Sequence, residues 1–296
     1  MREVVIISGK GGTGKTSLAA SFAYLEEANA LVSDCDVDAA NMHLLLDADF
    51  SSKEDFFSGE LAVIDEDICI NCGRCDEVCR FDAIDVIDDQ HRVNFISCEG
   101  CWYCSRVCPT EAIEMVKQKA GDLFVSNIKN GSKMVHAKLG FAAENSGKLV
   151  AKVKQEAKIL VLKEDKAYVI TDGSPGIGCP VISSLSGANL VLLVTEATVS
   201  GLHDLKRVHK LVKTFNYEAV CIINKYDLNE DVSQEIEKFL QEEDIKLVAK
   251  LPYDDTFTKA LAVAQPIVEY NSDGQLSLLI KESWESIKTI IKENDR

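Results

Sequence analysis

The stretch "EVVIISGKGGTGKT", residues 3–16, decides the fold of this chain. It joins a strand-like apolar run to the pattern G-x4-G-K-[ST], which begins at Gly9 and ends at Thr16. A helix-like stretch, "TSLAASFAYLEEA", follows, and a second apolar run, "ALVSD", ends at Asp34. This order of strand, loop, helix and strand predicts an α/β unit whose glycine-rich loop binds phosphate.

The residue types of this loop suit the phosphates of a nucleoside triphosphate. Glycines let backbone N–H groups approach the phosphates, and the helix N-terminus adds partial positive charge. Lys15 is expected to reach the β- and γ-phosphates, and the Thr16 hydroxyl to bind Mg²⁺. The alternative is a chance match in a glycine-rich turn, which would need neither the strand before it nor the helix after it. The predicted nucleotide-binding residues are Gly11, Gly12, Thr13, Gly14, Lys15, Thr16 and Ser17.

Strand-like and helix-like runs alternate along the rest of the chain, which predicts a doubly wound, mostly parallel sheet. A cysteine-rich block interrupts this pattern, so the expected nucleotide-binding domain is discontinuous, over 1–59 and 119–296, with an inserted domain at 60–118. The later strands are expected at 167–172, 189–196, 218–225 and 245–252, with helices at 145–158, 198–215 and 231–243.

The block repeats one cysteine pattern twice. "CINCGRCDEVCRFDAI" (69–84) and "CEGCWYCSRVCPTEAI" (98–113) superpose at an offset of 29, and each reads C-x2-C-x2-C-x3-C. Three close thiolates wrap one [4Fe–4S] cluster, and the fourth cysteine of each run binds the other cluster. The expected ligands are Cys69, Cys72, Cys75 and Cys108 for one cluster, and Cys98, Cys101, Cys104 and Cys79 for the other.

The block resembles bacterial two-cluster ferredoxins, which implies a small α+β domain. It departs from them at Arg80, which follows the last cysteine of the first run, whereas Pro109 follows the last cysteine of the second run. Two zinc sites, each with four cysteines, are the alternative, although zinc more often takes cysteine pairs.

The net charge of −16 argues against binding to bare nucleic acid or to an anionic membrane. Residues 60–118 hold 13 acids and 5 bases, which indicates a solubilising surface or a docking face for a basic redox partner. No apolar stretch approaches the roughly 20 residues of a membrane span, and no signal segment precedes the first strand. We therefore expect a cytoplasmic protein without stable membrane association, whose 11 cysteines serve metal rather than disulfides.

Lys10, directly after the first glycine of the loop, resembles the signature lysine of deviant Walker A ATPases. This MinD/ParA class includes the nitrogenase iron protein. The resemblance implies that ATP binding forms a homodimer, or a heterodimer with a paralogous ATPase, in which Lys10 reaches the partner's nucleotide. A second cation there would stabilise the transferring phosphoryl group. The alternative is a solvated loop lysine.

Other segments match the same family in order. In "SDCDVDAAN" (33–41), the resemblance implies that Asp36 orients or activates the attacking water near Mg²⁺, with Asp38 as a weaker second candidate. In "VITDGSPG" (169–176), it implies that Asp172 holds Mg²⁺ through water. Taken alone, each segment is consistent with an ordinary turn at a strand end, but the order and spacing of the segments together favour the family resemblance.

Two later segments resemble the family's base-binding elements. "IINKYD" (222–227) implies that Asn224 contacts adenine. "LPYDDTFTKA" (251–260) resembles the loop that covers the base, with Pro252 and Asp254 as expected contacts.

The three remaining cysteines lie outside the repeat. Cys179 follows Asp172 by seven residues, at the offset where the nitrogenase iron protein carries a cluster-bridging cysteine. No second such ligand is evident outside the insertion, so we expect Cys179 to be a small buried turn residue, with a thiol near a dimer axis as the alternative. Cys35 and Cys221 are expected in the core.

Three functions follow from these features. The favoured one is an ATPase that couples dimer switching to electron transfer through two [4Fe–4S] clusters, with slow turnover in the absence of its partner. The second is an ATPase that assembles iron–sulfur or metal cofactors. The third is a MinD-like positioning ATPase, which would need a membrane-binding terminal helix. The terminal stretch does align Leu276, Ile280, Trp284, Ile287 and Ile291, but packing on the sheet is the simpler expectation.

Overall fold

The computed structural model describes residues 1–140 and 145–294, and these fall into two compact units. Unit 1 comprises Met1–Glu54, Leu123–Lys138 and the chain from Ser146 onward, and unit 2 comprises Asp55–Asp122 and Leu139–Asn145. The expected division at 60–118 differs from these bounds by a few residues. It also left 139–145 with the ATPase domain. Residues 141–144 and 295–296 of the expected 119–296 segment lie outside the described residues.

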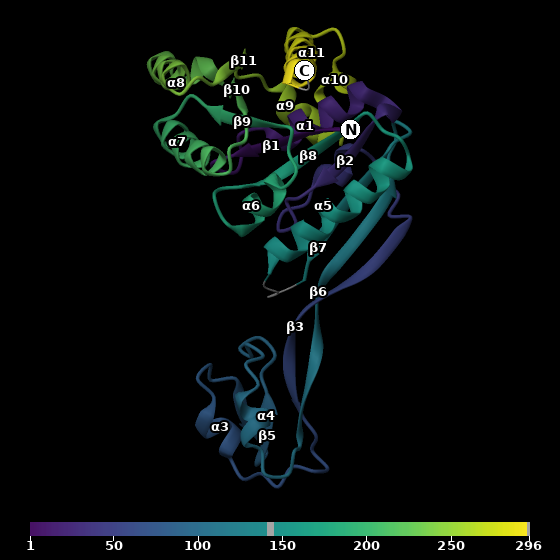
Figure 1. Cartoon of the computed structure of the whole chain (residues 1–296), viewed down its shortest axis with the longest axis vertical. Helices are drawn as coiled ribbons and strands as arrows, with labels where there is room; N and C mark the ends of the chain where they lie inside the picture. Colours follow the sequence, from purple (N-terminus) through teal and green to yellow (C-terminus); the bar gives the residue numbers. More distant parts are fainter. Residues whose placement is uncertain (141–144, 295–296) are drawn as a thin grey trace. The chain divides into compact units, whose positions relative to one another are not determined.

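A mostly parallel sheet forms the centre of unit 1 (Figure 1), as the alternating pattern predicted. Its order is β11-β10-β9-β1-β8-β2-β7-β6-β3. Strands β1, β2, β7, β8, β9, β10 and β11 pair in parallel with their neighbours. Their bounds are Arg2–Ser8 (β1), Ala30–Asp34 (β2), Lys133–Leu139 (β7), Tyr168–Pro175 (β8), Leu190–Glu196 (β9), Ala219–Asn224 (β10) and Lys246–Leu251 (β11).

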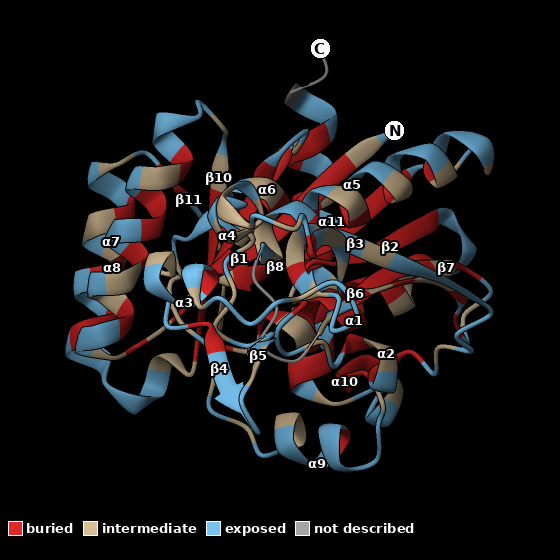
Figure 2. Cartoon of the chain, turned by 90° about the horizontal axis from the view of Figure 1, so that it is seen from below, coloured by how far each residue is buried: buried red, intermediate tan, exposed pale blue. Residues whose placement is uncertain are grey.

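Helices cover both faces of this sheet, because successive strand side chains point to opposite sides. Val4 and Ile6 of β1 share one core with α1, α10 and α11, whereas Val5 and Ile7 share the other with α6, α7 and α8. Figure 2 shows α7 and α8 with buried inner sides and exposed outer sides. The bounds are Lys15–Glu26 (α1), Met42–Leu45 (α2), Ser146–Lys163 (α5), Cys179–Leu185 (α6), Val199–Thr214 (α7), Glu230–Glu242 (α8), Thr256–Ala262 (α9), Ile267–Tyr270 (α10) and Gln275–Asn294 (α11).

The terminal helix α11 packs into the core, as predicted. Its apolar face is buried, and Trp284 stacks on Phe22 with ring centroids 4.9 Å apart. The Trp284 indole and the Lys288 ammonium both donate to Glu26 Oε1, at 2.7 and 2.8 Å. The buried residues are Leu276, Ile280, Trp284, Ile287 and Ile291.

Strands β3 (Ser52–Ile64) and β6 (Ile113–Asn127) were not predicted, and the chain crosses between the units within them. The short connection 128–132 between β6 and β7 is compatible only with an antiparallel pair. Among the helices of the described chain, none combines the length and apolarity needed to cross a membrane.

Unit 2 reproduces the sequence repeat in its structure. Helix α3 (Arg74–Val78) and helix α4 (Tyr103–Val107) occupy the same place in the two copies. Strands β4 (Ile84–Ile87) and β5 (Gln90–Val93) form an antiparallel hairpin between them. The buried core cluster described for this unit is small and comprises Ala62, Cys75, Ile84 and Ile113, and Ala83, Ala112 and Ala120 are also buried.

Candidate functional site

A large cavity lies at the carboxyl ends of the central strands of unit 1. Its empty volume is about 1230 Å³, counted to where it opens to solvent. All seven loop residues predicted to bind nucleotide line it. The cavity is lined by Gly11, Gly12, Thr13, Gly14, Lys15, Thr16, Ser17, Asp36, Asp38, Ala39, Asn41, Ser174, Pro175, Pro180, Asn224, Lys225, Phe257 and Leu261.

The loop needs glycine at Gly12 and Gly14, whose φ angles are 78° and 94°. At Gly14 a Cβ would also lie 2.7 Å from Asn224 Nδ2. Gly14 directly precedes helix α1, so free N–H groups at the helix start face the cavity. This backbone is built to surround an anion such as a polyphosphate.

Carboxylates gather beside Lys15 and Thr16. The Thr16 hydroxyl donates to Asp172 Oδ2 at 2.6 Å, and Lys15 Nζ lies 3.8 Å from Asp172 Oδ1. Burial raises the pKa of Asp172, against the opposing effects of Lys15 and Thr16. The structure therefore places Asp172 beside the Thr16 hydroxyl, the group that is expected to bind Mg²⁺.

Asp34 belongs to the same cluster, although the sequence did not single it out. It is fully buried, and burial together with the Asp172 carboxylate raises its pKa well above the usual range. Asp34 Oδ2 and Asp172 Oδ1 are buried without a hydrogen-bond partner in the described structure. A hard divalent cation such as Mg²⁺ fits these orphaned oxygens. The sequence signal that could have revealed Asp34 is its position at the end of β2, in register with Asp172 of β8.

Asp36 and Asp38 both line the cavity. The backbone N–H of Asp36 donates to Asp34 Oδ1 at 3.0 Å, which fixes the chain as it leaves β2. Burial raises the pKa of Asp36, and Lys15 opposes this effect. A partly buried carboxylate beside the phosphate loop is suitably placed to orient a water molecule.

Lys10 contacts helix α7 and the end of β9 rather than the cavity of its own chain. Its Nζ lies 2.6 Å from Glu196 Oε1 and donates to Ser200 Oγ at 2.9 Å. Lys225 forms a second ion pair with Glu196, at 3.0 Å. Burial alone would raise the pKa of Glu196, but hydrogen bonds from the two lysines lower it. The structure thus holds the Lys10 cation away from the lining of its own nucleotide cavity.

The end of the cavity where the base is expected differs in detail from the expectation. Asn224 lines it, and its Nδ2 donates to the Thr13 carbonyl at 2.9 Å, so its side chain also braces the phosphate loop. Pro252 and Asp254 are not among the described residues that line the cavity. The next helix, α9, supplies Phe257 and Leu261 instead. Their apolar surface suits a flat base, and their helical spacing of four residues was the missed signal.

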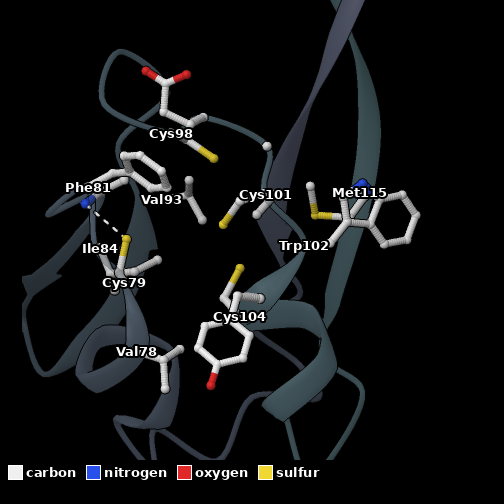
Figure 3. A pocket seen from close by; sticks show the side chains of 15 residues that line it. Val78, Cys79, Phe81, Ile84, Val93, Cys98, Cys101, Trp102, Cys104 and Met115 are labelled. Atoms are coloured by element: carbon white, nitrogen blue, oxygen red, sulfur yellow. Dashed lines mark hydrogen bonds between the residues drawn. The ribbon is translucent and has the colours of Figure 1, made fainter.

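Two smaller cavities lie in unit 2, and each is lined by four cysteines. The first is lined by Cys79, Cys98, Cys101 and Cys104, with an empty volume of about 370 Å³. In Figure 3 these four sulfur atoms face a common space. The second is lined by Cys69, Cys72, Cys75 and Cys108, with about 330 Å³.

The two copies also share local hydrogen bonds to sulfur. Ala83 N–H donates to Cys79 Sγ at 3.4 Å, and Ala112 N–H donates to Cys108 Sγ at 3.3 Å. Burial raises the pKa of Cys75 and Cys104. All eight cysteines are free. Within residues 1–140 and 145–294, no group of three or more His, Cys, Asp or Glu side chains is arranged to hold a metal ion.

The expectation that Cys179 is a buried turn residue is wrong. Cys179 is exposed and begins helix α6, because the chain after Gly178 turns into this short helix at the surface. Cys35 and Cys221 are fully buried, as predicted. Burial raises the pKa of the Cys35 thiol to about 12, so it is inert near neutral pH.

A strand, a glycine-rich loop, a helix N-terminus and buried carboxylates beside Lys15 and Thr16 define a P-loop nucleotide-binding protein. Residues 4–267 match the family described as the CobQ/CobB/MinD/ParA nucleotide binding domain. The chain belongs to this family, and it is a P-loop ATPase of the MinD/ParA type.

Two uncharacterized proteins of Methanocaldococcus jannaschii are related over nearly their whole length. MJ0578 is 36% identical over 98% of this chain and 97% of its own length. MJ0579 is 28% identical over 92% of this chain and 93% of its own length.

Solved structures of low identity share the fold. The septum site-determining protein MinD of Pyrococcus horikoshii, complexed with Mg-ADP, has a TM-score of 0.59 at 18% identity and covers 99% of this chain and 98% of its own. A ParA family ATPase from Chlorobium tepidum has a TM-score of 0.58 at 18% identity and covers 96% and 98%. At these identities the likeness concerns the fold alone.

Proposed function

We propose that this ATPase is a redox switch, in which ATP binding and hydrolysis control electron transfer through two [4Fe–4S] clusters. The observation that carries the proposal is the composition of the two cysteine cavities. The spacing rule pairs three cysteines of one run with the last cysteine of the other. Each cavity is lined by one such set of four.

The chemistry of the cavities fits a cluster. A [4Fe–4S] cubane has volume of its own, so its four thiolates stand around a space rather than converge on a point. The sulfurs here surround such a space, and the remaining lining is largely apolar, with Ile64, Ile70 and Ile113 in one cavity and Ala62, Ile84 and Val93 in the other. When bound, the clusters would supply one-electron chemistry. The protein would supply the ligands, a dry wall and the N–H donors to sulfur.

The nucleotide half of the switch rests on the carboxylate cluster and Lys10. Thr16, Asp36 and Asp172 would hold Mg²⁺ directly or through water, with Asp34 beside them, and Asp36 would orient the attacking water. Because Lys10 lies outside the cavity of its own chain, it is available to a partner subunit, as in the deviant Walker A class that includes the nitrogenase iron protein. We infer dimerisation on ATP binding. The presence of two relatives in one organism supports a heterodimer as well as a homodimer.

The electron partner is expected to be a protein with a basic docking face. Unit 2 carries the acidic excess counted from the sequence, and most of those carboxylates are exposed. Opposite charges across a docking face raise the association rate more than the final affinity. Free cysteine thiolates persist as ligands under reducing conditions such as the cytoplasm provides.

The first experiment is anaerobic purification followed by iron, sulfide and zinc analysis. We expect about eight irons per chain, since two cubanes hold four each. Cys101→Ser should lower the iron content by about half, whereas Cys179→Ser, another exposed cysteine, should leave it unchanged. Stoichiometric zinc with little iron would overturn the proposal.

The second candidate is an ATPase that assembles iron–sulfur or metal cofactors. The exposure of Cys72 and Cys101, one in each cavity, is the observation that favours it, since a cluster with an exposed ligand can be handed on. Incubation with an apo-ferredoxin separates the two functions, because cargo clusters would transfer and resident clusters would remain. The MinD-like positioning function is less well supported, since the apolar face of α11 is buried in the core.

A further inference from the structure

The repeat makes the two cysteine cavities natural controls for each other. Positions 29 apart hold equivalent places, and both copies face the same demand, which is to hold four thiolates around one space. Differences between equivalent positions are therefore not required for ligation. Such differences are candidates for residues that give one cavity a function which the other cavity lacks.

The largest difference is aromatic. Phe81, Trp102 and Tyr103 lie around the cavity of Cys101 and are 43%, 43% and 48% exposed. The equivalent residues at the cavity of Cys72 are Thr110, Gly73 and Arg74. Figure 3 shows Phe81 at the border of the space that the sulfurs face, whereas the Trp102 ring lies beside Met115, away from that space. Three exposed aromatic residues thus occur at the cavity of Cys101, where the other copy has none at the equivalent positions.

The backbone at Trp102 adopts a conformation that is unfavourable for a bulky side chain. Its φ is 68°, in the left-handed region, and the equivalent Gly73 has φ 75°. Glycine adopts this conformation without a steric penalty, whereas a bulky side chain does not. The Trp102 indole donates to Glu60 Oε2 at 2.6 Å, which fixes the ring. Strain of this kind is typical of functional sites.

An apolar groove borders the same cysteine. It is lined by Val78, Arg80, Phe81, Cys101 and Tyr103, with an empty volume of about 680 Å³ out to solvent. Cys101 is therefore shared between the cavity wall and the groove. A group seated in the groove would lie against Cys101, a proposed cluster ligand, so an electron would have a short route out of the protein.

The flanking charges define the occupant. Exposed carboxylates lie within two residues of the groove-lining positions, at Asp76, Glu77, Asp82 and Glu99, against the single base Arg80 of the lining. An apolar centre with an acidic surround is complementary to a protein face with an apolar centre and a basic rim. We propose that this groove is the docking site of a basic redox protein, which exchanges electrons with the cluster held by Cys79, Cys98, Cys101 and Cys104.

This inference rests on the proposed function and adds which cluster would pass electrons to the partner protein. Each exchange moves one electron. A reduced cluster held by these four cysteines would supply one electron, which the partner's centre would accept, and no bond would form or break. The other cavity has Arg74, His91 and Thr110 in its lining. A cluster bound there would exchange electrons with the first cluster rather than with this partner.

The test uses the holoprotein and cytochrome c, a small basic haem protein, as the probe. The double variant Phe81→Thr/Tyr103→Ser removes the aromatic border. The position of Phe81 is threonine in the other copy, so ligation should survive. Binding of oxidised cytochrome c at low salt should weaken about tenfold, and the rate of cytochrome c reduction should fall similarly. Ile87→Thr, on the exposed β4–β5 hairpin, is the matched control and should change neither.

Two further measurements keep the outcomes separate. Oxidation of the reduced protein by ferricyanide, a small anion that needs no apolar groove, should proceed at the wild-type rate in the double variant. Iron content and EPR spectra should also match wild type. Unchanged cytochrome c binding in the double variant, or an equal loss in Ile87→Thr, would overturn the docking site. Absence of iron in the wild-type protein would instead overturn the proposed function itself.

Discussion

The nucleotide cavity and the cysteine cavities differ in what holds their walls. At the nucleotide cavity, several polar side chains already have protein partners, as in the pairs Thr16–Asp172 and Asn224–Thr13, although Asp34 Oδ2 and Asp172 Oδ1 have no hydrogen-bond partner in the described structure. In the cysteine cavities, single backbone N–H groups reach Cys79 and Cys108, and apolar side chains form much of the remaining wall. The nucleotide cavity is thus organised before a ligand binds. Each cysteine cavity instead surrounds a space at a position where a domain would have its hydrophobic core.

The cores of the two units differ in the same way. Unit 1 has an extended buried core on each face of its sheet. The buried cluster of unit 2 is limited to Ala62, Cys75, Ile84 and Ile113, with partly buried cysteines against it. A small core of this kind rarely stabilises a unit without a metal or a cross-link. ATP would therefore bind to a preformed fold, whereas the proposed clusters would complete the fold of unit 2.

Removing the iron should therefore have the largest effect. Treatment with a strong iron chelator under reducing conditions should unfold unit 2, because metal binding free energy is folding free energy in such sites. Unit 1 should keep its fold and its MgATP binding. Limited proteolysis with mass spectrometry would measure this, with cleavage confined to residues 55–122 and 139–145. Protection of those residues after complete iron loss would show that unit 2 needs no cluster.

Lysine substitutions should separate binding from turnover in the nucleotide cavity. Lys15→Ala should abolish tight ATP binding, because it removes a buried cation beside the phosphate loop. Lys10→Ala should bind ATP normally yet lose turnover by about 10³- to 10⁵-fold, the typical value of a cation supplied in trans. Isothermal titration and phosphate release measure the two effects.

Glu196→Gln is the control for the Lys10 variant, since it removes the ion pair with Lys10 but keeps the lysine. It tests whether the loss arises from breaking that ion pair. Normal hydrolysis by Lys10→Ala would contradict the trans role, and an equal loss in Glu196→Gln would assign the effect to the ion pair.

The sequence predicted what depends on local pattern and could not predict what depends on register. The phosphate loop, the parallel strands and the buried face of α11 follow from motif and periodicity. Asp34 was missed because its burial arises only when β2 pairs with β8. Phe257 and Leu261 were missed because the base-binding loop was matched by its letters, whereas the following helix α9 lines the cavity.

The misplacement of Cys179 has a similar origin. An apolar residue after a strand was assumed to be buried, but the first turn of α6 lies at the surface. Strands β3 and β6 have mixed burial along their length, without the continuous apolar run of a central strand. Their sequences therefore lacked the apolar pattern from which the other strands of the sheet were predicted.

The carboxylate cluster should make Mg²⁺ binding depend on pH. Burial and the neighbouring Asp172 carboxylate both raise the pKa of Asp34, and burial also raises the pKa of Asp172. Mg²⁺ binds the ionised forms, so a raised pKa means that protons compete as the pH falls. The Mg²⁺-dependent part of ATP affinity should increase with pH, by at most about tenfold per unit for each proton released. Above the raised pKa values it should level off.

Titration calorimetry in buffers of different ionisation enthalpy counts the released protons. ATP binding with EDTA in place of Mg²⁺ is the control and should show a weaker pH dependence. Asp34→Asn should reduce the number of protons released in the Mg²⁺ series. An unchanged number in this variant would show that Asp34 does not titrate with metal binding.

The smallest expected effect is the energetic link between the two sites. The chain offers a physical route within unit 1, since α2 follows the Asp36–Asn41 segment and its His43 contacts Phe50, just before β3, and His136 of β7. His43, Phe50, Phe124 and His136 form one aromatic cluster there, with ring centroids 5.0–5.8 Å apart. A shift of α2 on nucleotide binding would be felt where β3 begins and β6 ends.

If nucleotide and electron are coupled, the linkage is reciprocal. Typical couplings of roughly 1–3 kcal/mol correspond to about 40–130 mV for a one-electron couple. Bound ATP adds negative charge, and closure of a dimer would remove water from the clusters. Both disfavour an added electron, so at least one midpoint potential should fall with MgATP. An EPR-monitored redox titration with a non-hydrolysable analogue measures this, with Lys15→Ala as the nucleotide-free control. Phe124→Ala should reduce the shift without changing iron content. Potentials that agree within about 15 mV in a dimeric, nucleotide-bound sample, well under the tenfold step of 59 mV, would leave docking as the only gate. They would also favour the assembly function.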